Sequence, residues 1–259
     1  KIAKLEQTGF KVDTKIASGY DFVYYFTVRF AKGVTVIRHS YVYRGGGSVE
    51  AAHDFDYRLT TGTTWANSAI DDFELNIDMG DDSYYSVPAS FTNTAPAAWQ
   101  VAGIGRISKT SFAVPYIAEG ADKLRMVYMR RGKLQLRATA FKPVKDLTLS
   151  FWNLHNEVNL WCDNKAANDF ADIMQFVWGD SVTTYIAGLS DAQLRLYRNL
   201  NYARAGYEFK DEALRKTFSN YNWYIADPAV KIDNTPDYYI TKEVMKLILE
   251  EEKRRRGSK

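Results

Sequence analysis

The sequence is poor in cysteine, histidine and proline, with one, three and six of these residues in 259, and it has no long apolar run. A single cysteine, Cys162, excludes a disulfide within the chain and a cysteine-rich zinc site. Its apolar neighbours lead us to expect a buried structural thiol. No apolar run approaches the roughly 18 residues that a membrane-spanning helix needs. The composition therefore excludes a disulfide-rich scaffold.

An excess of one charge is also missing, because 34 basic side chains face 31 acidic ones and the net charge is +3. This balance argues against a general binder of nucleic acid or of a membrane surface. The hydrophobic fraction of 46% and the charged fraction of 25% are typical of a globular protein. Aromatic residues reach 15%, which suits either a β-rich core or a binding surface.

The first part of the chain alternates between apolar and polar residues, as strands do. Tyr20–Phe30 and Val34–Tyr43 are rich in β-branched and aromatic residues and predict a hairpin around Ala31-Lys32-Gly33. A second hairpin is predicted around Arg131-Gly132, which interrupts two alternating runs. Roughly nine or ten short strands at regular spacing predict an antiparallel β-sandwich. We assign this sandwich to residues 1–160.

The apolar period changes to a helical one near residues 158–163. A first helix is predicted from the helical spacing of apolar residues over 170–178, with Asp163 or Asn164 as its N-cap. Ser190-x-x-Gln193 has the pattern of a capping box, Asp211 is a candidate N-cap, and Thr241 opens a last helix. Residues 161–259 are therefore predicted to form a small all-α domain. The fold class is α+β and multidomain, with an N-terminal antiparallel β-sandwich followed by this helical domain.

The string Tyr202-Ala203-Arg204-Ala205-Gly206 stands at the end of one predicted helix. Gly206 suits the left-handed residue that ends a helix, and Arg204 is favoured near a helix C-terminus by the helix dipole. Tyr207 and Phe209 can fold back onto the last turn. These residues predict a structural role for the string: a helix, a glycine stop and an aromatic lid.

The order and spacing of residues from Ser190 to Tyr224 and somewhat beyond resemble the YARHG domain of bacteria. The matching residues are Leu196 to Asn199, Tyr202, Ala203, Arg204, Gly206, Tyr207, Phe209, Phe218, Trp223 and Tyr224. The resemblance implies a secreted or cell-envelope protein and brings no established activity. Ala205 stands where the family has its histidine, so a role that needs that imidazole cannot apply here.

We expect a non-catalytic protein of the cell envelope or the exterior, without a cofactor. Its expected partner is peptidoglycan, another envelope polysaccharide or an envelope protein, because exposed tyrosine and tryptophan rings stack on sugars. The candidate binding residues are Tyr202, Arg204, Tyr207, Tyr221, Trp223 and Tyr224. One alternative is a structural or protein-interaction scaffold.

A hydrolase is the other alternative, although no catalytic motif is present. His39, His53 and His155 show no ligand spacing, and the pair Asp54 and Asp56 is only the kind of carboxylate pair that glycosidases use. The acidic segment Asp78–Asp82 is the best candidate for a Ca²⁺ site, but it lacks the EF-hand spacing, and Asp and Gly are ordinary turn residues. We therefore expect no catalytic residue and no metal site.

Overall fold

The computed structural model describes residues 28–42, 45–46, 53–109, 111, 123–151, 182–221, 223–231 and 240–257. The chain divides into two compact units, Lys1–Tyr43 and Arg44–Lys259. The predicted domain boundary between residues 160 and 161 lies outside the described residues, as do Cys162, His155 and the helix predicted over 170–178.

In the first unit, residues 28–42 contain no strand, although the sequence predicts one over Val34–Tyr43. Gly33 does bend the chain, with φ at 105°. The side chains that gave the strand signal are exposed, and Val42 is 99% exposed. β-branched residues favour strands because they pack on neighbouring strands, and residues 28–42 have no such neighbour among the described residues. Most of the hairpin's first arm, residues 20–27, is not described.

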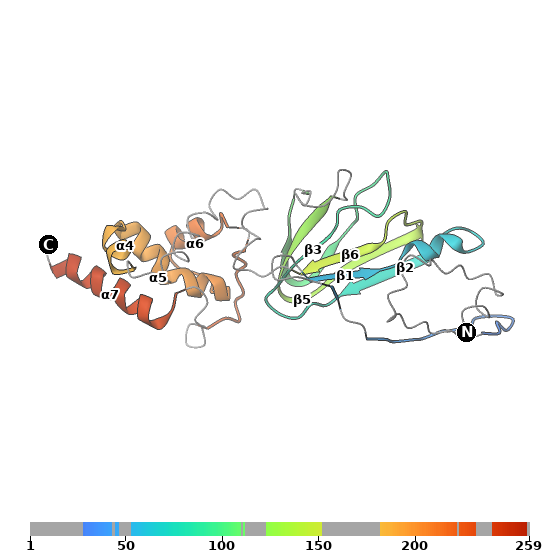
Figure 1. Cartoon of the computed structure of the whole chain (residues 1–259), viewed down its shortest axis with the longest axis horizontal. Helices are drawn as coiled ribbons and strands as arrows, with labels where there is room; N and C mark the ends of the chain where they lie inside the picture. Colours follow the sequence, from blue (N-terminus) through green and yellow to red (C-terminus); the bar gives the residue numbers. More distant parts are fainter. Residues whose placement is uncertain are drawn as a thin grey trace. The chain divides into compact units, whose positions relative to one another are not determined.

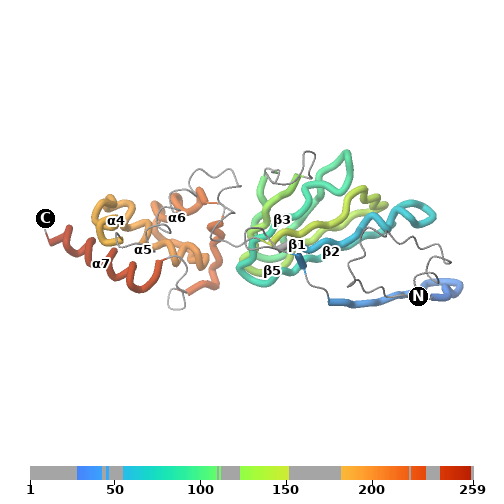
Figure 2. Tube along the Cα trace, in the orientation of Figure 1, coloured from blue at the N-terminus to red at the C-terminus, as the bar shows by residue number. Residues whose placement is uncertain are grey.

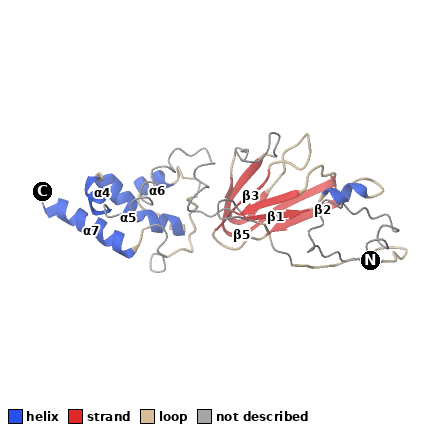
Figure 3. Ribbon diagram, viewed as in Figure 1, coloured by secondary structure: helices blue, strands red, loops and turns tan. Residues whose placement is uncertain are grey.

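The second unit contains a six-stranded antiparallel sheet (Figures 1 and 3). Its strands are β1 (His53–Tyr57), β2 (Ile70–Ile77), β3 (Ser83–Pro88), β4 (Gln100–Ile107), β5 (Leu124–Phe141) and β6 (Leu147–Phe151). The order is β1-β6-β3-β5-β2, and β4 also pairs with β5. A short 3-10 helix, η2 (Thr60–Thr64), links β1 to β2.

The long strand β5 organises this sheet, because three strands pair with it. Residues 127–129 of β5 pair with both β3 and β4, and residues 134 and 135 pair with both β2 and β4. β2 and β3 therefore follow one another along one edge of β5, and β4 occupies the other edge.

The predicted hairpin at Arg131-Gly132 is wrong, because β5 runs through these residues without turning. Gly132 pairs with Gly103 on β4, and both have positive φ. A Cβ on Gly132 would lie 2.4 Å from the carbonyl oxygen of Ala102. Gly132 is needed because the backbones of β4 and β5 approach closely here. A glycine in a strand pattern can mark such a close approach as well as a turn.

The predicted sandwich is not confirmed, since the described strands form a single curled sheet (Figure 2). One core cluster lies within the sheet and includes Tyr85, Val127 and Leu134. Their strand neighbours Tyr84, Met126 and Tyr128 belong instead to a cluster shared with the helices. Strands that bury residues on both faces carry apolar residues on both, and here Tyr84, Met126 and Tyr128 pack against the C-terminal part of the chain.

Four helices are described in the C-terminal part: α4 (Val182–Gly188), α5 (Asp191–Ala205), α6 (Glu212–Phe218) and α7 (Lys242–Gly257) (Figure 1). None of the helices within the described ranges has the length and apolarity needed to cross a membrane. The predicted capping box is confirmed, because Ser190 and Gln193 bond reciprocally at the start of α5. Asp211 caps α6 as predicted, accepting a hydrogen bond from the backbone N–H of Leu214.

Candidate functional site

The Tyr202–Gly206 string forms the last turn of α5 and its cap. Gly206 adopts the left-handed conformation, with φ at 87°, and its N–H is bonded to the carbonyl of Ala203 at 2.9 Å. The N–H of Tyr207 reaches the carbonyl of Tyr202 at 2.8 Å, so the chain closes the helix by the expected glycine stop. A Cβ on Gly206 would lie 2.8 Å from both Arg130 Nε and the carbonyl oxygen of Ile225. Glycine is thus required here for conformation and for space.

Arg204 is a core residue of this turn, with only 3% of its surface exposed. Its guanidinium donates a hydrogen bond to the hydroxyl of Tyr84 on β3. The guanidinium carbon lies 4.8 Å from the centre of the Tyr84 ring and 5.7 Å from that of Trp223. A buried cation needs such partners, because an uncompensated charge in the core is costly. Arg204 therefore joins α5 to the sheet.

Arg130 on β5 completes the same joint from the sheet side. It is also buried, and it donates to the carbonyl oxygen of Arg204 at 2.8 Å, where the end of α5 leaves carbonyls without helical partners. It also forms an ion pair with Asp82 at the start of β3. A guanidinium at a helix C-terminus is favoured by the helix dipole.

Arg131, the next residue, is linked to Gly206 through Asp227. Its Nε lies 2.7 Å from Asp227 Oδ2, and the Asp227 backbone N–H donates to the Gly206 carbonyl at 2.8 Å. Hydrogen bonds from Arg131 hold the pKa of Asp227 below its usual range. The ion pair thus holds the segment around Asp227 against the end of α5.

A β-bulge explains how two consecutive arginines serve one helix end. The β4–β5 pairing passes from Ile104 opposite Arg131 directly to Gly105 opposite Met129, so Arg130 has no partner on β4. Successive side chains of a regular strand point to opposite faces, and a bulge redirects them. Sequence reasoning missed both arginines as site residues, since Arg-Gly resembles a turn and their partners lie far along the chain.

The aromatic residues predicted to bind a ligand form the core around this joint. Tyr221, Trp223 and Tyr224 are buried, whereas Tyr202 and Tyr207 are half-buried. Tyr224 donates from its hydroxyl to the carbonyl of Tyr207 at 2.9 Å, and burial raises its pKa. Stacking on a sugar requires an accessible ring face, so the argument for glycan binding by these rings is lost. A binding role for the six predicted residues stays a prediction.

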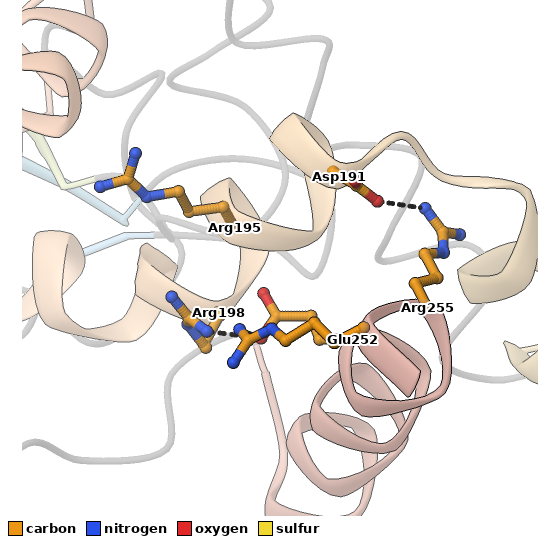
Figure 4. Close-up of a pocket in the computed structure, with 6 residues that line it drawn as sticks. Asp191, Arg195, Arg198, Glu252 and Arg255 are labelled. Atoms are coloured by element: carbon orange, nitrogen blue, oxygen red, sulfur yellow. Dashed lines mark hydrogen bonds and ion pairs between the residues drawn. The ribbon is translucent and has the colours of Figure 1, made fainter. Parts of the chain in front are cut away.

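A surface pocket of about 340 Å³ lies between the first half of α5 and the last turns of α7 (Figure 4). Its charged lining comes from both helices: Asp191, Arg195, Arg198, Glu252, Arg255 and Arg256. We call this the α5–α7 pocket. The sequence shows charges of both signs at the end of the last helix, and it gives no sign that this end faces α5.

Ion pairs hold the walls of the α5–α7 pocket together. Arg198 lies 2.5 Å from Glu252, and Arg255 lies 2.9 Å from Asp191, so each pair crosses between the helices (Figure 4). Arg255 also lies 2.6 Å from Glu251. Hydrogen bonds from Arg254 and then Arg255 lower the pKa of Glu251 to about 2. Glu251 therefore stays ionised and holds the Arg255 guanidinium in place.

Among the side chains that the structure describes, the remaining sequence candidates make ordinary local contacts. In the acidic turn, Asp82 pairs with Arg130, and Asp78 accepts a hydrogen bond from the N–H of Gly80 at 3.0 Å. Asp56 accepts from Thr148 at 2.8 Å, and the ring of His39 stacks with that of Tyr41. Within the described ranges, His, Cys and carboxylate side chains form no group of three or more that could hold a metal ion.

Comparison with known proteins gives one family and one structure. No curated protein matches the chain. A crystal structure from Legionella pneumophila subsp. pneumophila strain Philadelphia 1, provisionally named a nutrient binding protein, is similar at 20% identity and a TM-score of 0.35. The match covers 78% of this chain and 53% of that one, so this chain spans about half its length. The family model matches residues 175–248, and the C-terminal part of this protein is a YARHG domain, a type of domain typical of extracellular proteins.

Proposed function

We propose that this is a non-catalytic protein of the bacterial cell envelope or exterior whose helical part binds an envelope component. The YARHG domain at residues 175–248 supports this location. The binding role is carried by one observation: the α5–α7 pocket is open at the surface and lined by charged side chains from two helices. Small-molecule sites in proteins usually have volumes of roughly 300–1,000 Å³. The volume of this pocket, about 340 Å³, lies within that range.

The contrast with the Tyr202–Gly206 joint supports this choice of site. In the joint, Arg204 and Trp223 are buried and bonded within the fold, so a ligand could reach them only after the core opened. In the pocket, the side chains of Arg195 and Arg256 are exposed, and each contacts one carboxylate at the surface. Binding therefore belongs to the pocket, and the joint serves the fold.

Co-sedimentation with purified envelope material tests this proposal. The full chain is mixed with insoluble peptidoglycan carrying its attached polymers and, in parallel, with neutral cellulose. We expect saturable recovery of the protein in the envelope pellet and none with cellulose. Recovery of all the protein in the supernatant from both materials contradicts the proposal.

A structural or protein-interaction role is the second candidate, favoured by the exposed apolar side chains of residues 28–42. Val34, Val36 and Val42 are all exposed in this segment. Contiguous exposed apolar surface is typical of protein interaction sites. Sedimentation equilibrium of the full chain tests this role: a concentration-dependent dimer supports it, and a monomer at all concentrations contradicts self-assembly.

A further inference from the structure

We propose that the α5–α7 pocket binds an anionic polymer of the envelope, through carboxylate or phosphate groups held by Arg195 and Arg256. This inference rests on the proposed function and gives the chemical class of the ligand. The pocket brings four guanidinium groups together against two carboxylates in its lining. The lining itself is more basic than the whole chain, which has 34 basic and 31 acidic residues, and two further carboxylates beside it, those of Asp211 and Glu251, pair with Arg195 and Arg255.

Arg198 and Arg255 are the less exposed arginines of the pocket, and ion pairs with carboxylates of the protein hold them in place. Their side chains are only 31% and 21% exposed. Arg255 donates to Glu251, to Asp191 and to the carbonyl of Ala187, the last at 2.9 Å. Guanidinium groups fixed in this way need no further ordering when a ligand arrives, which favours binding.

Arg195 and Arg256 are the groups available to a ligand. The side chain of Arg256 is 74% exposed, and its contact with Glu252 is long, at 3.4 Å. The Arg195 side chain is 45% exposed and pairs with Asp211, which is itself 42% exposed. Exposed ion pairs of this kind contribute little to stability, so an external anion exchanges with them at small cost.

The ligand's charged groups are oxyanions because of guanidinium geometry. Arginine presents a planar fork that matches carboxylate and phosphate oxygens, and the pocket already pairs Arg255 and Arg198 with the carboxylates of Asp191 and Glu252 through single contacts. Nucleic acid is disfavoured, since a duplex needs a long basic stripe and the chain carries a net charge of only +3. An acidic polymer that presents one or two units to the pocket fits the charge and the size.

The test measures binding by isothermal titration calorimetry at constant ionic strength. The probes are polygalacturonate, inorganic polyphosphate, neutral dextran and a single-stranded oligonucleotide. We compare the full chain with the double variant Arg195→Gln/Arg256→Gln. The control is Arg58→Gln/Arg137→Gln, which removes two other exposed, carboxylate-paired arginines from the sheet part. The pair of acidic probes distinguishes a carboxylate polymer from a phosphate polymer.

We expect saturable binding of one or both acidic probes and none of dextran. The pocket variant should bind at least about tenfold more weakly, which corresponds to about 1.4 kcal/mol, while the control stays within about twofold. Equal losses in both variants, unchanged affinity in the pocket variant, or equally tight binding of the oligonucleotide would overturn the proposal. The single variant Arg256→Gln, altered at the more exposed position, gives the same readout if the double variant unfolds.

The envelope pull-down separates this inference from the proposed function. Envelope binding that persists in Arg195→Gln/Arg256→Gln supports the function and contradicts the pocket as its site. Arginine-dependent binding of an acidic probe, without recovery in the envelope pellet, supports the pocket's ligand class and contradicts the function.

Discussion

Arg130 in the middle of β5 donates a hydrogen bond to the carbonyl oxygen of Arg204, the residue two positions before the glycine that ends α5. Arg204 in turn donates to the hydroxyl of Tyr84 on β3. The sheet therefore donates one hydrogen bond to the end of α5 and accepts another from it. The string that identifies the YARHG domain is therefore a joint between the helical part and the sheet of this unit. Its residues act on stability, and the ligand contact that we propose lies elsewhere, between α5 and α7.

Gly206→Ala should destabilise the protein by more than about 1 kcal/mol, because alanine disfavours positive φ and its Cβ would clash. The clash is with Arg130 Nε and the Ile225 carbonyl, each 2.8 Å away. Gly188→Ala is the matched control, since a Cβ there meets no atom within 4 Å. We expect the control to be neutral or stabilising in urea unfolding. Equal effects of the two substitutions would contradict the role of Gly206.

Trp223→Ala should cost about 3–5 kcal/mol in the free energy of unfolding, as for other large buried side chains. Trp223 packs against Phe218, Tyr221 and the Arg204 guanidinium. Trp65→Ala is the control, because Trp65 is 58% exposed, and its effect should stay within about 0.5 kcal/mol. A folded Trp223→Ala protein of unchanged stability would show that this ring is not core.

Stability should fall in acid through the ion pair between Arg131 and Asp227. The pKa of Asp227 is lower in the folded state than its usual value of 3.8, so the pair stabilises the protein above about pH 4. That contribution is lost as the pH falls through the lowered pKa. Urea unfolding of wild type and Asp227→Asn between pH 7 and pH 3 should give a difference that shrinks with acid. A difference that is constant across this range contradicts the prediction.

Helix ends were predictable because their chemistry is local. The capping box at Ser190, the glycine stop at Gly206 and the cap at Asp211 each involve residues within a few positions of one another. Phe73, Leu75 and Ile77 of β2, like Leu147, Leu149 and Phe151 of β6, alternate with polar residues as strand residues do. Such signals depend on backbone groups that every helix or strand end must satisfy, so they survive without knowledge of the tertiary structure.

Long-range features could not be predicted, since nothing local marks them. Gly132 has a turn-like neighbourhood, and only its pairing with Gly103 shows why a glycine is needed. Burial of Trp223 depends on a helix and a sheet meeting. The α5–α7 pocket joins residues more than fifty positions apart, such as Arg198 and Glu252. An aromatic-rich or charge-rich segment has the same composition on a surface and in a core.

The coupling free energy between Arg204 and Tyr84 tests the central claim most directly. A double-mutant cycle with Arg204→Met and Tyr84→Phe, measured by urea unfolding, isolates the hydrogen bond between the guanidinium and the hydroxyl. A structural joint predicts a coupling of about 1.5–3 kcal/mol, the range for a hydrogen bond to a charged group. Effects that add to within about 0.5 kcal/mol would show that the two residues are energetically independent and would contradict the joint.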